Sequence, residues 1–151
     1  MFRPWLNVSL LLLLWATSAH GETIFTTSLD GATAGSGSPA TGAATLTLND
    51  EETEVSYVVE YANLQDFETG THFHGTEPAP QGSRFHTLPF GAFKVGTWHV
   101  GPDEVAELIA GHVYVLIHTE LYIAGELRGD FSSFTVPTDS YSWGAVKTLF
   151  R

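Results

Sequence analysis

Residues 71–75 read THFHG, and residues 113–119 read VYVLIHT. In the first segment His72 and His74 stand on either side of Phe73. In the second, His118 is two positions apart from other even-numbered residues, and Val113, Val115 and Ile117 occupy the odd-numbered positions. Side chains alternate between the two faces of a β-strand, so Phe73 and the odd-numbered aliphatic residues of the second segment are predicted to face a core. The same parity places three histidines on the opposite, outer face: His72, His74 and His118.

The sequence around these segments has the pattern of a β-meander. Short alternating stretches are separated by turns rich in Gly, Pro, Asn and Asp, which fits a sandwich or a Greek-key barrel with one buried face per strand. The predicted strands cover residues 22–29, 44–48, 55–61, 67–75, 90–100, 112–119 and 125–131. The segments between them, including residues 31–42 and 76–82, are predicted loops.

One segment has the signals of a helix. Pro102 comes first, Asp103 and Glu104 follow in the first turn, and Gly111 closes the segment. At two to three turns, it is predicted to be a short connection between strands.

Three separated motifs carry a family resemblance: HFHG at residues 72–75, VYVLIHT at residues 113–119 and AGELRG at residues 124–129. In this order and spacing they resemble the CHRD domain, the chordin-type domain, over about residues 23–132. The resemblance implies an all-β, immunoglobulin-like or Greek-key β-sandwich in an exported protein. It also implies a binding or interaction module.

The first 21 residues have the layout of a secretory signal peptide. Arg3 precedes an apolar run that is too short to span a bilayer, and the small residues Ala19 and Gly21 both fit as cleavage points. We therefore expect a secreted protein, extracellular or periplasmic, with a signal peptide at 1–21, a sandwich domain at 22–134 and a C-terminal tail at 135–151.

The composition limits the classes of partner. The chain has 6 Lys plus Arg against 17 Asp plus Glu, a formal net charge of -11. Such acidity disfavours nucleic acid and anionic membranes, where basic residues supply most of the affinity. It favours an extracellular protein or a cationic ligand as partner. Cysteine is absent, so stability must come from the core or a metal rather than from disulfides, and the chain fits a bacterial-type single-domain protein.

The histidine pattern predicts a metal site. Two imidazoles in a His-x-His strand lie about 6.5 to 7 Å apart at the backbone, within reach of one ion. His118, on a neighbouring strand, is the candidate third ligand, and His86, expected in the loop after His74, the fourth. Histidine ligands suit copper or zinc. The alternative is structural, with the imidazoles hydrogen-bonding to carbonyls or to threonine hydroxyls.

The order of these histidines is similar to the copper-ligand layout of copper-zinc superoxide dismutases. This leaves open a copper-dependent redox enzyme, with Arg128 near the metal. Another alternative depends on cleavage after Ala19, because His20 would then be N-terminal and its amine and ring could chelate copper.

Glu126 and Arg128 lie two residues apart, on one face of the last predicted strand. We expect them to form structural ion pairs with neighbouring strands. Alternatively, the planar guanidinium of Arg128 binds an anion or a carboxylate.

Overall fold

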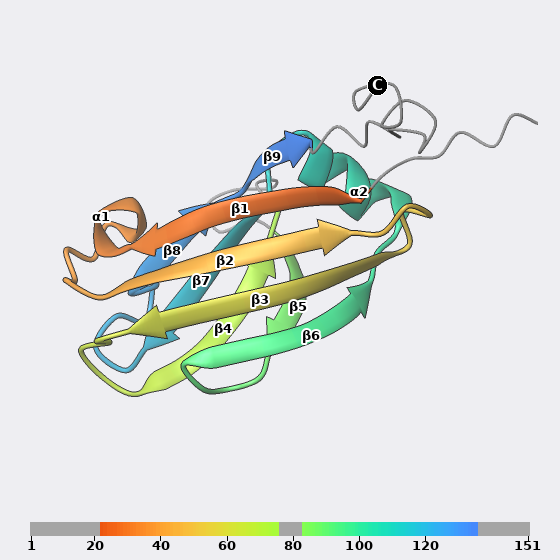
Figure 1. Cartoon of the computed structure of the whole chain (residues 1–151). Coiled ribbons are helices and arrows are strands. Elements are labelled where there is room, and N and C mark those ends of the chain that lie inside the picture. Colours follow the sequence, from red (N-terminus) through yellow and green to blue (C-terminus); the bar gives the residue numbers. More distant parts are fainter. Residues whose placement is uncertain (1–21, 76–82, 136–151) are drawn as a thin grey trace, which may run out of the picture.

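The computed structural model describes residues 22–75 and 83–135 (Figure 1). The predicted signal peptide at 1–21 and the tail beyond Thr135 lie outside these residues. The described elements are β1 (Thr23–Asp30), α1 (Gly31–Ala34), β2 (Thr41–Leu48), β3 (Glu54–Ala62), β4 (Glu68–His74), β5 (Arg84–Leu88), β6 (Phe93–His99), α2 (Pro102–Ile109), β7 (Tyr114–Thr119), β8 (Leu127–Asp130) and β9 (Ser132–Thr135).

The strands form one antiparallel sheet that folds over on itself. Its order is β5-β4-β7-β8-β1-β2-β3-β6, and β9 pairs with β1. Figure 1 shows two layers, with β1, β2, β3 and β6 in one and β8, β7, β4 and β5 in the other. The layers join where Asp30 of β1 pairs with Arg128 of β8. The predicted all-β sandwich is confirmed.

The core lies between the two layers and follows the parity of the strands. Phe25 and Leu46 of one layer meet Phe73, Val115 and Ile117 of the other, and all five side chains are fully buried. Burial of large apolar side chains is the main force that holds such layers together. From Thr71 onward the odd-numbered residues of β4, and those of β7, therefore face the core, as the alternation predicts.

The observed strands and helices differ from the predicted ones in several segments. Residues 84–88 form β5, and residues 132–135 form β9. β2 starts at Thr41, earlier than predicted. Within it Gly42 passes close to β3, where a Cβ atom would lie 2.5 Å from the Glu60 carbonyl oxygen. The Gly-rich loop also contains α1, which is capped by the Asp30 side chain accepting from the Thr33 amide at 2.6 Å.

The predicted helix is confirmed as α2. Pro102 occupies its first turn, and the Glu104 carboxylate accepts a hydrogen bond from the Gly101 amide at 2.9 Å. Val105 and Leu108 are buried against the core, so α2 covers part of it while carrying the chain from β6 in one layer to β7 in the other. Within the described ranges, no helix is both long and apolar enough to cross a membrane.

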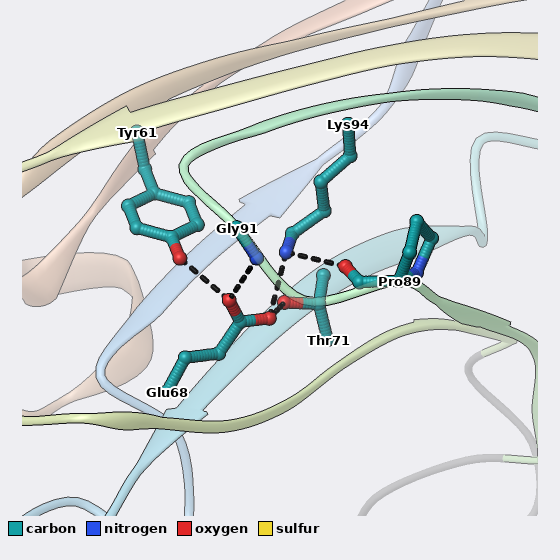
Figure 2. Close-up of polar contacts among 6 residues, drawn as sticks. All are labelled: Tyr61, Glu68, Thr71, Pro89, Gly91 and Lys94. Carbon is teal, nitrogen blue, oxygen red and sulfur yellow. Dashed lines mark hydrogen bonds and ion pairs between the residues drawn. The ribbon is translucent and has the colours of Figure 1, made fainter.

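A buried ion pair joins the layers between β4 and β6 (Figure 2). The Lys94 ammonium lies 2.7 Å from a Glu68 oxygen, and the exposed fractions of the two side chains are 0% and 6%. Four further groups complete the network: the Tyr61 hydroxyl, the Thr71 hydroxyl and the Gly91 amide donate to Glu68, and the Pro89 carbonyl accepts from Lys94. Every oxygen of this buried carboxylate is therefore hydrogen-bonded, as its burial requires.

Candidate metal site

The pairing of β4 with β7 brings three histidines together on the outer face of the second layer. His74 lies opposite Tyr114, His72 opposite Leu116, and Gly70 opposite His118. Residues paired in this way share a face of the sheet. One ring nitrogen from each of His72, His74 and His118 can be chosen so that all three lie within 4.8 Å of one another.

The three rings pack closely. The His72 ring is central, with its centroid 5.6 Å from that of His74 and 5.2 Å from that of His118. His74 stacks on Tyr114 at 5.1 Å with an interplanar angle of 7°. His72 and His74 are only 8% and 5% exposed, whereas His118 is half-buried. The outer face is thus a covered site at this point rather than an open surface.

A backbone carbonyl orients the ring of His118. Its Nδ1 atom lies 2.8 Å from the Ile123 carbonyl oxygen, in the loop between β7 and β8. Because a carbonyl only accepts, we assign the proton to Nδ1, which leaves the lone pair of the neutral ring on Nε2. A hydrogen bond from the second ring nitrogen to a carbonyl fixes the tautomer and the orientation of histidines that bind metals.

His72 is held in its neutral form. Burial, the positive charge of Arg84 and the neighbouring histidines lower the pKa of His72 to about 4, although Glu68 opposes the shift. Its buried Nδ1 atom has no hydrogen-bond partner among the described residues. Such an atom is costly to leave unpaired, and a metal ion is one group that would satisfy it.

The absence of a side chain at Gly70 gives the His72 ring its place. A Cβ atom at position 70 would lie 3.0 Å from Cε1 and 3.3 Å from Nε2 of that ring. The His72 ring therefore lies over Gly70, and Gly70 is the residue that pairs with His118.

His86 does not join the other three histidines. It lies on β5 opposite Phe73, on the core side of the sheet, so it belongs to the face opposite His72 and His74. Its ring stacks on Trp98 at 5.2 Å and on Phe73 at 6.4 Å, and burial lowers its pKa. The expectation of a fourth ligand at His86 fails because residues 84–88 form a strand with its own parity.

Arg128 forms its ion pair within its own strand. Its Nη2 atom lies 2.6 Å from Oδ1 of Asp130, and its Nε atom also donates to that carboxylate. The guanidinium carbon lies 3.8 Å from the centre of the Tyr114 ring, a cation-π contact. Through Tyr114, Arg128 packs next to the stack that contains His74.

Glu126 differs from the predicted ion pair. Within the described part of the chain it forms no salt bridge, although its exposed fraction is 0%. Its carboxylate instead accepts hydrogen bonds from the Ser38 hydroxyl at 2.7 Å, the backbone amide of Gln65 at 2.7 Å and the Thr119 hydroxyl at 2.8 Å. Three neutral donors replace the expected basic partner, and they join three separate segments of the chain.

The sequence reasoning missed four residues that shape this site: Gly70, Arg84, Tyr114 and Ile123. The parity of β7 puts Tyr114 on the histidine face, but only the register with β4 shows that it stacks on His74. Ile123 acts through its backbone carbonyl, which every residue has, so the identity of this residue gives no indication of its role.

One comparison with known proteins identifies a family. The family model described as CHRD domain matches residues 25–131, which include all three clustered histidines and the GELRG segment. The search of the curated proteins found no match. Membership in this family supports a binding or interaction module, and its domains are typically extracellular. Because the match covers most of the chain and the sandwich from β1 to β8, this chain belongs to the CHRD domain family.

Proposed function

We propose that this protein is a secreted binding module that holds one copper or zinc ion at His72, His74 and His118. The observation that carries the proposal is the clustering of three imidazole nitrogens within 4.8 Å on one face of the sandwich. Two nitrogens bound to one ion at 2.0 to 2.1 Å lie at most about 4.2 Å apart, so small ring rotations would close the set.

The chemistry of the three rings supports the same proposal. His118 presents Nε2 because its Nδ1 atom donates to the Ile123 carbonyl. The lowered pKa of His72 leaves that ring neutral at pH 7, and only a neutral imidazole binds a metal. Copper and zinc are the divalent ions that imidazole ligands suit best here, whereas calcium and magnesium prefer oxygen.

Metal titration of protein purified without an affinity tag tests the proposal. We expect one Cu²⁺ or Zn²⁺ per chain by calorimetry and elemental analysis. Free metal at one hundred times Kd should raise the free energy of unfolding by about 2.7 kcal/mol. His118→Ala should abolish both effects. The matched control is His99→Ala, because the His99 side chain is 89% exposed and lies on β6. Equal binding by both variants would contradict the proposed ligand set.

The Gly70→Ala variant tests the position of the His72 ring. The new Cβ atom would lie 3.0 Å from the ring and would displace it by a few tenths of an ångström. We expect metal affinity to fall by about tenfold, the size of effect seen when the support of a ligand is changed.

The control for this variant is Gly101→Ala, where a Cβ atom meets nothing closer than Glu104 Oε2 at 4.0 Å. This second variant should keep the affinity of the wild type. If Gly70→Ala bound metal as tightly as the wild type, the His72 ring would not be a ligand in the position described.

A further inference from the structure

Two of the three Lys and Arg residues of the described domain lie on β5 and β8, the strands that flank the histidine cluster. Residues 22–75 and 83–135 contain three Lys or Arg residues: Arg84, Lys94 and Arg128. Lys94 is fully buried and paired with Glu68. The other two lie on the histidine face, since Arg84 of β5 is opposite His74 and Arg128 of β8 is opposite Leu116. In a chain of net charge -11, this face therefore carries both arginines of the described residues.

The two arginines differ in how their charges are compensated. Arg128 is neutralised by Asp130 at 2.6 Å. Arg84, by contrast, is exposed and forms no ion pair with another described residue. Its charge acts on His72 and helps to keep that ring unprotonated. An arginine that has no ion pair in the described part of the chain and lies opposite His74 also repels a divalent cation bound there, so Arg84 by itself works against the proposed metal.

Three described carboxylates, on β1, β4 and β8, are already engaged with other groups. Asp130 binds Arg128, Glu68 binds Lys94, and Asp30 caps α1 by accepting from the Thr33 amide. The candidate ligand group consists of the three histidines, with no acid among the described residues that joins them. Three histidines leave at least one coordination position of zinc or copper open to an exogenous ligand.

We infer that this open position binds a small carboxylate or bicarbonate anion, with Arg84 as its charge partner. The inference rests on the proposed metal site. An oxygen anion would be attracted by the metal on one side and by the guanidinium on the other. It would thereby remove the repulsion between the metal and Arg84 that the metal-bound protein would otherwise contain. Arginine suits this role because its planar fork matches a carboxylate.

The test uses the protein loaded with Cu²⁺ and titrated with azide, whose binding to copper is visible as a charge-transfer band. Acetate and bicarbonate are then titrated as competitors. We expect Arg84→Gln to weaken azide and acetate binding by about tenfold or more, because a hydrogen bond to a charged partner is lost. The same variant should bind Cu²⁺ at least as tightly as the wild type, since a repulsive charge is gone.

The control is Thr97→Glu, which also lowers the net charge by one unit but at an exposed position on β6, the far end of the sheet order. This variant should leave azide affinity within twofold. Equal azide affinities for Arg84→Gln and the wild type would overturn the anion site while leaving the metal site intact. Equal weakening by Thr97→Glu would also overturn it, because net charge alone would explain the effect. If the wild type took up no metal, both proposals would be wrong.

Discussion

Lys94→Met is expected to lower the free energy of unfolding by about 3 to 5 kcal/mol, because it leaves the Glu68 carboxylate buried without its cation. The Lys94 side chain is fully buried and its ammonium donates at 2.7 Å both to Glu68 and to the Pro89 carbonyl. Methionine fills a similar volume, so the loss would come from electrostatics and not from a cavity. Urea denaturation at pH 7 measures it.

The double variant Lys94→Met/Glu68→Gln separates the charge from the packing. Glutamine can still accept from the Tyr61 hydroxyl and the Gly91 amide, so these two hydrogen bonds of Figure 2 remain. We expect the double variant to be more stable than Lys94→Met by about 2 kcal/mol or more, because no buried charge is left unpaired. A double variant as unstable as the single one would show that the ion pair is not the cause.

The pH dependence of the same variants gives an independent check. Burial tends to raise the pKa of the Glu68 carboxyl, but the hydrogen bonds from Lys94, Thr71 and Tyr61 outweigh it and hold the pKa below its ordinary value. This contribution to stability is therefore present at neutral pH and is lost as the pH falls through the folded-state pKa. Without Lys94 the folded-state pKa should rise, so the deficit of Lys94→Met should shrink on acidification.

The faces of the strands follow from one short-range rule, whereas the histidine cluster also needs β4 to pair with β7. Alternation with period two assigns Phe73 and Ile117 to the core and His72, His74 and His118 to the other face, and it needs no knowledge of the partner strand. Similarly, the helix signals at Pro102 and Glu104 are local, and α2 begins where they predict.

The parts that could not be predicted depend on register and on contacts between layers. His86 lies in a short strand whose pairing with β4 contains a bulge after Phe73, so its face could not be read from its distance along the chain. The Lys94 and Glu68 pair joins strands 26 residues apart in different layers. A buried lysine on an otherwise exposed edge strand carries no local signal of its partner.

Glu126→Ala is expected to lower the free energy of unfolding by about 3 to 5 kcal/mol. The Ser38 hydroxyl, the Gln65 amide and the Thr119 hydroxyl all donate to this carboxylate, and each unsatisfied buried group costs about 1 to 3 kcal/mol. The three donors come from the loop before β2, the connection before β4 and the end of β7. Thermal and urea unfolding measure the loss, and exposed Glu120, at the start of the same loop, supplies the control variant Glu120→Ala, expected within about 0.5 kcal/mol of the wild type.

The same substitution should reach the histidine cluster through the loop between β7 and β8. Thr119 is held by Glu126 and accepts from the Tyr122 amide at 3.2 Å, and the next residue, Ile123, orients His118. Loss of the carboxylate should loosen this loop and weaken Zn²⁺ binding by about tenfold, because the Ile123 carbonyl that orients the His118 ring is then less firmly placed. Glu126→Gln keeps one acceptor oxygen, so we expect it to lose only about 1 to 2 kcal/mol of stability. Its Zn²⁺ affinity should stay close to that of the wild type. If Glu126→Ala kept full Zn²⁺ affinity despite its lower stability, the loop would not be what positions His118.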